Sequence, residues 1–478
     1  MSVLKNLQPE SVFSWFEQLC AIPHGSRNTK AVSDWLAGFA ADRGLECIQD
    51  SLNNIIIFGP ASAGYEGAEP VILQGHMDMV CEKAPDCELD MEKDGLSLAV
   101  EGETVLAKGT TLGGDDGIAV AMMLALLDDD SLPHPPLECV FTVDEEIGML
   151  GAMDLDVSSL RGRRMLNMDS EAEGIFTVSC AGGRVVTSTL PVNSAPFSGT
   201  PLRLDLGGLT GGHSGVEIHK GRANANVLLG RALYTLHRSV SLRLISLEGG
   251  LKDNAIPVQS SAEFLTDAPD EAARICRELE TVFRSEYAAT DPDLSMTVRP
   301  GTGGVSMDED STARTICLLM NAPAGVQAMS ADVEGLVQTS LNLGVLTCSE
   351  GRVSAAFCLR SSVESQKEAM TDQLVCLTER LGGRAEVSGD YPGWAYRRES
   401  PLRDLMIQVF TEQYGHPPVI DAVHAGLECG LFAGKLPGLD CVSIGPNLTD
   451  IHTYRERMHI PSVRRTWALV TGTLKRMK

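Results

Sequence analysis

The feature that most constrains this chain is the segment Leu137–Gly148, LECVFTVDEEIG. Its apolar, β-branched-rich first half predicts a buried strand, and Asp144, Glu145 and Glu146 follow it directly. Three adjacent carboxylates repel one another and favour neither strand nor helix. Taken alone, the triplet also fits a solvated turn. The other strand ends of the chain decide between these interpretations.

Several other predicted strands end in potential metal ligands. Pro70–Gln74 leads into His76 and Asp78, and Arg164–Met168 leads into Asp169. A glycine-rich turn, GTTLGGDDG, carries Asp115 ahead of the apolar helix expected at Ile118–Leu127, and His452 lies in a loop beyond the strand expected at Leu439–Ile444. Because ligands gather at the carboxyl ends of strands in open parallel sheets, these side chains are expected to share one cleft.

The chemistry of this set favours divalent cations. Two imidazoles with several carboxylates suit zinc first, then cobalt or manganese. So many carboxylates need more than one cation to offset their repulsion, which indicates two metal ions with a shared carboxylate. The turn GTTLGGDDG is not a phosphate-binding loop, because it lacks the Gly-Lys-Ser/Thr ending and its aspartates would repel phosphate. Asp115 and Asp116 also fit simple helix-dipole and capping roles.

The pattern of elements predicts two domains in three segments. Alternating strands and helices over residues 1–185 predict an α/β domain with a mostly parallel central sheet flanked by helices. Residues 186–390 change to half-exposed strands, glycine-rich turns and two helical stretches, near Asn224–His237 and Pro269–Tyr287, which predicts an inserted α+β domain. Residues 391–478 return to the first domain. The segment Cys81–Val105 is acidic and is predicted to be irregular.

Composition excludes several classes of partner. The formal charge of −25 argues against a sequence-independent nucleic-acid surface and against anionic membranes. No apolar run approaches the roughly 20 residues that span a bilayer, and the N-terminus lacks the features of a secretory signal. We therefore expect a cytoplasmic protein. The 13 cysteines form no Cys-x-x-Cys pair and predict reduced, structural thiols.

The motifs GHMDMV, GTTLGGDDG, DEEIG and NMDSE, in this order, resemble the dinuclear zinc aminoacylase/carboxypeptidase/dipeptidase superfamily. Four further stretches look like its aminoacyl-histidine (Xaa-His) dipeptidase branch: CAGG at 180–183, GLTGGHSGVEIHKGRANAN at 208–226, DAVHAGLECGLF at 421–432 and VSIGP at 442–446. The resemblance covers nearly the whole chain. It implies hydrolysis of dipeptides, carnosine-type substrates included, by a water that bridges two metal ions.

The resemblance also implies a role for individual residues. His76 and Asp169 would hold one metal ion, Glu146 and His452 the other, and Asp115 would bridge the two. Glu145 would be the general base, and Asp78 would hold and polarise His76. The Asp115–Asp116 peptide would be cis. Asp144 is expected to be solvated, and His459, which could compete with His452, is expected to mark an element boundary.

For the inserted domain the resemblance implies a lid that binds substrate. His213 would polarise the scissile carbonyl, and Asn254 and Arg360 would bind the terminal carboxylate of the substrate. His219 and His424 could line the site or be structural. The resemblance further implies a homodimer through this lid. Where the branch usually reads Ser-Pro-Asp-Glu after the last metal histidine, this chain has 453–456 TYRE, which leaves histidine specificity open.

Other functions stay open from sequence alone. An N-acyl amino-acid amidohydrolase or a tripeptidase would share the metal site and differ in the inserted domain. A non-catalytic metal- or peptide-binding protein would require a broken site, whereas every expected ligand and the base are present. An oligomeric scaffold held together by the second domain would be favoured only if purified protein carried no metal.

Overall fold

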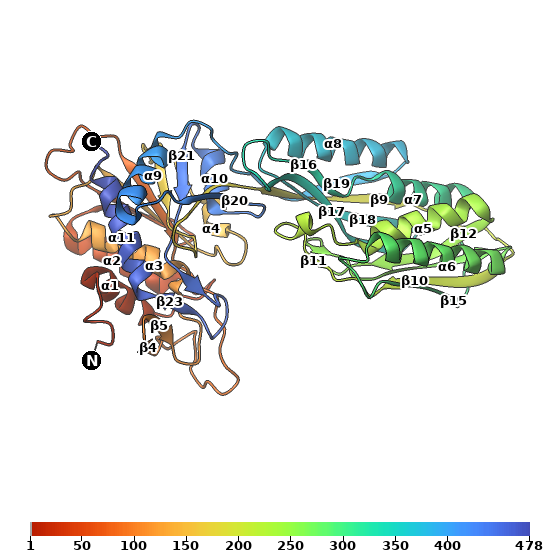
Figure 1. Cartoon of the computed structure of the whole chain (residues 1–478), viewed down its shortest axis with the longest axis horizontal. Helices are drawn as coiled ribbons and strands as arrows, with labels where there is room; N and C mark the ends of the chain where they lie inside the picture. Colours follow the sequence, from red (N-terminus) through yellow and green to blue (C-terminus); the bar gives the residue numbers. More distant parts are fainter. Residues whose placement is uncertain (1) are drawn as a thin grey trace. The chain divides into compact units, whose positions relative to one another are not determined.

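The computed structural model describes residues 2–478, which divide into two compact units (Figure 1). The first unit comprises the chain up to Ser179 together with Tyr396–Ala422 and Leu427–Lys478, and the second comprises Cys180–Ala395 and Val423–Gly426. The chain enters the second unit several residues before residue 186, because strand β9 (Gly182–Pro191) already pairs throughout with strands of that unit. The short return at residues 423–426 has no counterpart in the sequence pattern.

The first unit is built on an eight-stranded sheet. Its strand order is β1 (Glu46–Gln49), β2 (Ile55–Gly59), β6 (Leu137–Thr142), β3 (Val71–His76), β7 (Arg164–Asn167), β21 (Asp440–Ser443), β8 (Ile175–Cys180) and β20 (Val419–Val423). The four strands β6, β3, β7 and β21 are parallel, whereas β1 and β2 pair antiparallel with their neighbours and β8 pairs antiparallel with β21. The expected mostly parallel centre is confirmed.

The helices of the first unit are α1 (Glu10–Cys20), α2 (Lys30–Arg43), α3 (Gly114–Leu127), α4 (Leu150–Asp154), α9 (Pro401–Tyr414), α10 (Glu428–Lys435) and α11 (Ile460–Leu474). Helix α3 is buried along almost its whole length and contacts both β3 and α1. A side chain at Gly117 would meet Leu19 and Phe16 of α1 at 3.0 and 3.3 Å, so the glycine permits this close packing. The start of α3 is thereby fixed against the sheet.

The segment expected to be irregular contains two strands, β4 (Leu98–Glu101) and β5 (Thr104–Ala107). They form a hairpin around Gly102, which adopts a φ of 61°, and they join β23 (Arg457–His459) and β22 (Leu448–Thr449) in a four-stranded sheet. The expectation of an irregular segment was wrong, because the acidic residues at the hairpin turn obscure the short alternation of apolar and polar residues in the two strands. This sheet fixes the two ends of the loop that carries His452.

The second unit contains an antiparallel nine-stranded sheet. Its order is β15 (Ser295–Pro300), β10 (Thr200–Gly207), β14 (Ser260–Thr266), β12 (Leu242–Gly249), β17 (Val337–Ser349), β18 (Arg352–Ser361), β9 and β19 (Arg384–Tyr391), with β16 (Gly325–Met329) beside β17. A small pair, β11 (Gly212–His213) with β13 (Ala255–Ile256), and a 3₁₀ turn at Ile218–Lys220 complete its strands and turns within the described residues.

Four helices of the second unit contribute to one apolar core with the large sheet: α5 (Ala225–Ser239), α6 (Pro269–Glu286), α7 (Glu309–Asn321) and α8 (Glu364–Arg380) (Figure 1). The sequence predicts only the first two. Helix α8 escaped prediction because the face it buries includes Lys367, Thr371 and Thr378 beside Met370 and Leu374, which weakens the apolar stripe. The expected α+β character of this unit is confirmed.

Candidate functional site

The strand ends of the first unit bring the predicted ligands together. His76 is the last residue of β3, Asp169 follows β7, and Glu145 and Glu146 follow β6. Asp115 lies in the first turn of α3, where the helix starts with non-helical backbone angles and the Asp115–Asp116 peptide is cis. The cis geometry that the family resemblance implied is confirmed.

Asp115 lies between the two histidines. Its Oδ1 is 3.1 Å from His76 Nε2, and its Oδ2 is 3.1 Å from His452 Nε2. His76 Nε2 is also 3.6 Å from Asp169 Oδ1, and His452 Nε2 is 3.0 Å from Glu146 Oε1. The two oxygens of one carboxylate therefore face two separate imidazole groups, each with a second carboxylate beside it.

The tautomer of His76 follows from its other ring nitrogen. Nδ1 donates to the backbone carbonyl of Asp78 at 2.9 Å, and a carbonyl can only accept. In the neutral ring, Nε2 is then left with a lone pair that faces Asp115 and Asp169, which is the arrangement a metal ligand needs. The carboxylate of Asp78 is farther away, 3.5 Å from Nδ1, and accepts instead from Ser26 Oγ and the Glu145 backbone N–H.

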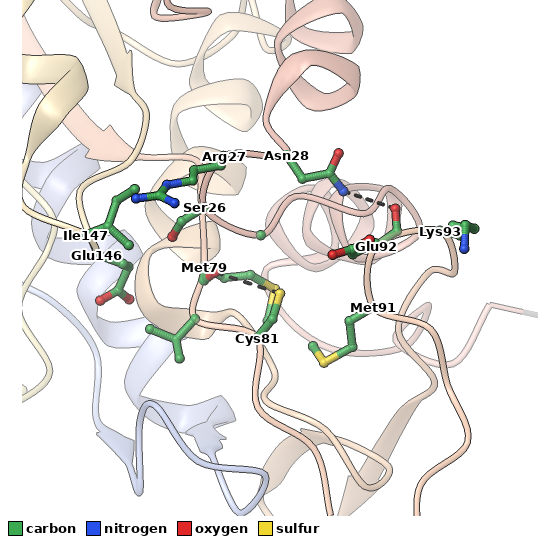
Figure 2. A pocket seen from close by; sticks show the side chains of 12 residues that line it. Ser26, Arg27, Asn28, Met79, Cys81, Met91, Glu92, Lys93, Glu146 and Ile147 are labelled. Carbon is green, nitrogen blue, oxygen red and sulfur yellow. Dashed lines mark hydrogen bonds between the residues drawn. The ribbon is translucent and has the colours of Figure 1, made fainter.

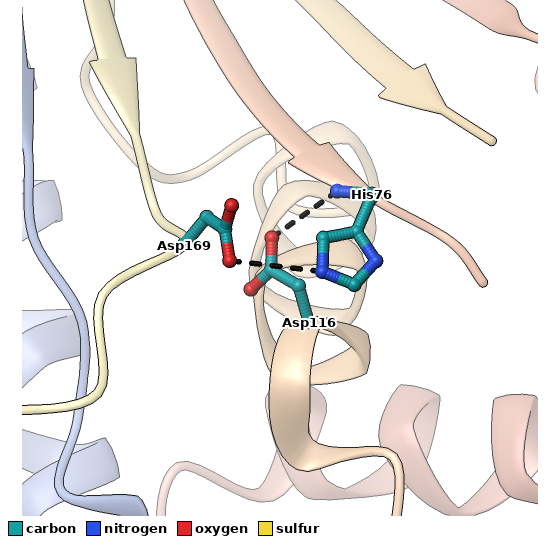
Figure 3. Close-up of side chains that lie close together, drawn as sticks. All are labelled: His76, Asp116 and Asp169. Atoms are coloured by element: carbon teal, nitrogen blue, oxygen red, sulfur yellow. Dashed lines mark hydrogen bonds and ion pairs between the residues drawn. The ribbon is translucent and has the colours of Figure 1, made fainter. Parts of the chain in front are cut away.

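Asp116 is a further buried acid at this centre, for which the sequence suggested only helix-dipole and capping roles. Its Oδ2 accepts from the His76 backbone N–H at 3.2 Å, and Figure 3 shows it beside His76 and Asp169. A Cβ at Gly75 would come within 2.4 Å of that oxygen, so the glycine of the GHMD motif makes room for the carboxylate. The adjacent aspartates in the sequence were the available signal.

Three overlapping groups have ligand atoms within 4.8 Å of one another: His76 with Asp116 and Asp169, His76 with Glu145 and Glu146, and Asp115 with Glu146 and His452. Glu146 Oε1 is buried, and its ion pair is the one with His452 Nε2 at 3.0 Å. Because the carboxylates of these groups outnumber the two histidines and buried charge is costly, this donor set fits bound cations. Nitrogen and oxygen donors in this mixture suit zinc and its neighbours.

The ionisation of the metal-free cluster reflects crowded negative charge. Burial, together with neighbouring carboxylates, raises the pKa of Asp169 to about 6 and raises the pKa of Glu145 well above its usual value. Ion pairs with Asp115 and Glu146 raise the pKa of His452 to about 10. Burial lowers the pKa of His76, but its carboxylate partners outweigh burial and raise it overall. Protons therefore relieve the repulsion when no cation is bound.

Two buried glutamates support this cluster, and sequence reasoning assigned neither a role. Glu428, at the start of α10, accepts from Gln74 Nε2 at 2.5 Å and from Thr142 Oγ1 at 2.7 Å, and burial raises its pKa to about 7. Glu456 accepts from the backbone N–H groups of Leu112, Gly113 and Gly114 at 2.7–3.1 Å. It therefore holds the glycine-rich turn that presents Asp115. For Glu428, the available signal in the sequence was its partner Gln74, a polar residue within an apolar strand.

A cavity of about 750 Å³ adjoins Glu146 in the first unit (Figure 2). Met79 and Met91 give it buried apolar walls, and Ile147 lies beside Glu146. Arg27 also lines it and adopts a φ of 67°, held by a hydrogen bond of 2.6 Å from its backbone N–H to Asp144 Oδ1. Asp144, expected to be solvated, is half-buried and shapes this wall.

The second unit holds the predicted substrate-binding residues. His213 Nδ1 accepts from the backbone N–H groups of Gly215 and Val216 at 3.1 and 3.2 Å, so the neutral ring carries its proton on Nε2. Burial and the charge of Arg360 lower the pKa of His213. Its free Nε2–H is then a hydrogen-bond donor at neutral pH.

The other predicted residues of this unit differ in burial. Arg360 is buried, with 7% of its surface exposed, and its Nη1 donates to Tyr391 Oη at 3.0 Å. His424 is buried, and burial together with the charge of Arg360 lowers its pKa to about 3. Asn254 and His219 are exposed. Tyr391 was missed, because no sequence signal connects it to Arg360.

The sequence profile of peptidase family M20/M25/M40 matches residues 72–476, and the chain belongs to this family. It is 38% identical over 480 residues to the cytosol non-specific dipeptidase of Escherichia coli, covering 99% of both chains. The crystal structure of aminoacylhistidine dipeptidase from Vibrio alginolyticus matches with a TM-score of 0.94 and 35% identity, over 99% of this chain and 98% of that one.

A more distant structure, the aminopeptidase PepT of Bacillus cereus, matches with a TM-score of 0.56 and 17% identity over 98% of each chain, which shows a shared fold. Within residues 2–478, none of the helices has the length and apolar character needed to cross a bilayer.

Proposed function

We propose that this chain is a metal-dependent dipeptidase that releases the N-terminal residue of its substrate. The observation that carries the proposal is the position of Asp115, whose two oxygens face His76 and His452 at equal distances of 3.1 Å. Full-length similarity to two dipeptidases supports the same class of reaction. A cytoplasmic location is proposed from the name of the Escherichia coli relative.

Two divalent cations, most simply Zn²⁺, fit the donor set. His76 and Asp169 would hold one, Glu146 and His452 the other, and Asp115 would contact both. Bound there, they would lower the pKa of a water molecule and polarise the peptide carbonyl. They would also offset the negative charge that protons neutralise in the metal-free cluster. Because Co²⁺ and Mn²⁺ suit the same nitrogen and oxygen donors, they are tested alongside zinc.

Glu145 is proposed as the general base. It lies three residues after the end of β6, and its backbone N–H donates to Asp78 Oδ1 at 3.1 Å, which fixes the start of its side chain. As a carboxylate it can take the proton from the attacking water and pass it to the leaving amine. Asp78 connects this residue to His76, whose Nδ1 proton is held by the Asp78 carbonyl.

The substrate-binding roles of His213, Asn254 and Arg360 remain predictions. The Nε2–H donor of neutral His213 is suited to a carbonyl oxygen that gains negative charge. The buried guanidinium of Arg360 is suited to the terminal carboxylate of a dipeptide. A homodimer formed through the inserted domain remains a further proposal.

The cavity beside Glu146 offers space for the side chain of the N-terminal residue. Its methionine walls can adapt to different apolar groups, so this cavity would accept a range of first residues. Met91→Trp should narrow this range and slow dipeptides with large first residues more than Gly-initiated ones. An equal effect on both would argue against this use of the cavity.

The deciding experiment is a substrate panel assayed after chelation and after restoration of Zn²⁺, Co²⁺ or Mn²⁺. It contains Ala-Ala, β-Ala-His, a tripeptide and N-acetyl-alanine. Hydrolysis of dipeptides that is lost on chelation and regained with metal is expected. Preferred cleavage of N-acetyl-alanine or of the tripeptide would replace the proposal with an amidohydrolase or a tripeptidase, and the rate for β-Ala-His would measure histidine selectivity.

A further inference from the structure

Three residues lie abreast on adjacent strands of the second unit. In the register of the sheet, Arg360 of β18 is opposite Gly183 of β9, and Gly183 is opposite Tyr391 of β19. Gly183 belongs to the CAGG stretch. The side chains of Arg360 and Tyr391 thus lie on either side of a glycine.

The absence of a side chain at Gly183 is what lets Tyr391 reach Arg360. A Cβ at Gly183 would come within 2.4 Å of both Cζ and Oη of Tyr391, so the phenol ring occupies the space above the glycine. Across that space, Arg360 Nη1 donates to Tyr391 Oη at 3.0 Å. The CAGG glycine is therefore explained by the tyrosine that lies over it.

The guanidinium of Arg360 is buried without a compensating negative charge. Among residues 2–478, no carboxylate lies within ion-pair distance of it, and its Nε makes no hydrogen bond. Its neighbours His213 and His424 are neutral, with pKa values lowered by burial and by the charge of Arg360 itself. An unpaired buried cation of this kind is costly unless an anion binds to it.

The hydrogen bond to Tyr391 determines which edge of the guanidinium stays available. With Nη1 engaged and Nε buried, Nη2 is the guanidinium nitrogen that remains for contact with a carboxylate. Nε itself is enclosed, because a Cβ at Gly215 would lie 3.0 Å from Arg360 Nε, 3.0 Å from His213 Cε1 and 2.4 Å from the His424 carbonyl oxygen. The absence of a side chain at Gly215 thus lets its backbone pack beside the guanidinium.

We propose that Tyr391 is a positioning residue that orients Arg360 so that its Nη2 receives the terminal carboxylate of the substrate. The inference rests on the proposed dipeptidase function, which it extends to a residue with no previous role. Tyr391 acts through Arg360, so its loss should weaken recognition of the carboxylate and leave the chemical step almost unchanged.

Tyr391→Phe in the full-length, metal-loaded protein tests this proposal, because it keeps the ring over Gly183 and removes only the hydroxyl. For Ala-Ala, KM should rise about 10-fold with kcat changed less than 2-fold, as expected for one hydrogen bond to a charged group. For the C-terminal amide of the same dipeptide, which lacks the carboxylate, the substitution should have little effect. An equal loss on both substrates, or an unchanged KM, would overturn the proposal.

Tyr414→Phe is the matched control. It removes a tyrosine hydroxyl that binds Glu173 in the first unit, so it reports the general cost of losing such a group. It should leave KM for both substrates unchanged. A double variant adds a second criterion: in an Arg360→Ala background, Tyr391→Phe should cause no further rise in KM, and an additive effect would contradict action through Arg360.

Failure of the proposed function is distinguishable from failure of this inference. If wild-type protein hydrolyses no dipeptide, binding of free L-alanine is measured by calorimetry for wild type and Tyr391→Phe. Weaker binding of the amino acid by the variant would still support the role of Tyr391, whereas equal binding or no binding to either protein would reject it.

Discussion

Each unit contains a buried cluster with uncompensated charge, and the two clusters differ in sign. The cluster of the first unit has two histidines among a larger number of carboxylates, whereas Arg360 in the second unit has no carboxylate partner among the described residues. The first cluster can relieve its repulsion by taking up protons, as the raised pKa values of Asp169 and Glu145 indicate. An arginine cannot lose its proton at physiological pH.

This difference explains the state of the neighbouring histidines. Beside carboxylates, the pKa of His452 rises to about 10, and beside Arg360 that of His424 falls to about 3. The same side chain is thus cationic in one metal-free cluster and neutral in the other. We infer that the first cluster is built for cations and the second for an anion, as a peptidase of this family would require.

Glu145→Gln provides the largest expected effect on the first cluster. The amide cannot accept the proton of the attacking water, so kcat should fall by about 10²–10⁴-fold. Metal content, measured by atomic emission, should stay the same because the proposed ligands remain. Glu88→Gln, at an exposed position, is the control and should retain full activity. Substantial turnover by Glu145→Gln would reject this residue as the base.

Arg360→Ala tests the second cluster. Loss of a charged hydrogen-bonding partner costs about 1.5–3 kcal/mol, so kcat/KM for Ala-Ala should fall roughly 10- to 100-fold, mainly through KM. Arg243→Ala removes an arginine of the same unit that pairs with exposed Glu309 at 2.7 Å, and it should have little effect. An Arg360 variant with wild-type KM would show that no anion binds there.

The pH dependence of the stability of the metal-free protein tests the charge of the first cluster. The pKa of His452 is about 10 when folded and roughly 6.5 when unfolded, so its stabilising contribution is complete below pH 6.5 and is lost as pH rises through 10. The raised pKa of Asp169, about 6, also makes the folded protein less stable as pH rises, in this case between roughly pH 4 and 6.

Thermal unfolding between pH 6 and 10 should therefore show that metal-free protein loses stability as pH rises. The difference from zinc-loaded protein should widen over the same range, because metal binding displaces the His452 proton. In His452→Ala, the stability of the metal-free protein should fall less steeply with rising pH. A metal-free protein whose stability rises from pH 7 to 9 would contradict the ion pairs that hold His452 charged.

The sequence was sufficient for the residues that end a strand. His76, Asp169, Glu145 and Glu146 were identifiable because an apolar run followed by a polar side chain is a local pattern, and parallel strands bring such ends to one edge. The fold class followed from the same local alternation. Helix α8 was not identifiable, because three of the five residues it buries are polar.

Residues that act through long-range contacts could not be found in this way. Glu456 binds backbone groups more than 340 positions earlier, and Glu428 binds Gln74 at a separation of 354 positions. Tyr391 depends on the register of three strands. No local pattern encodes such pairs, because either partner alone is an ordinary glutamate, glutamine or tyrosine.

The smallest expected effect comes from Glu456→Gln, which perturbs the first cluster without removing a proposed ligand. The carboxylate accepts three backbone N–H groups of the glycine-rich turn at 2.7–3.1 Å. Glutamine offers one acceptor oxygen, and its amide would place N–H against N–H. The turn that carries Asp115 should loosen, and metal affinity should fall about 3- to 10-fold, which corresponds to about 1 kcal/mol.

Competition with a chelator of known affinity measures this change. Glu412→Gln is the matched control, since Glu412 pairs with Arg476 at the surface of the same unit and should not alter metal binding. If Glu456→Gln binds metal as tightly as wild type, the position of Asp115 is set by α3 and its packing on α1 alone. If affinity falls while kcat at saturating metal is retained, Glu456 acts on the cation cluster only through the turn, because it contacts neither His76 nor His452.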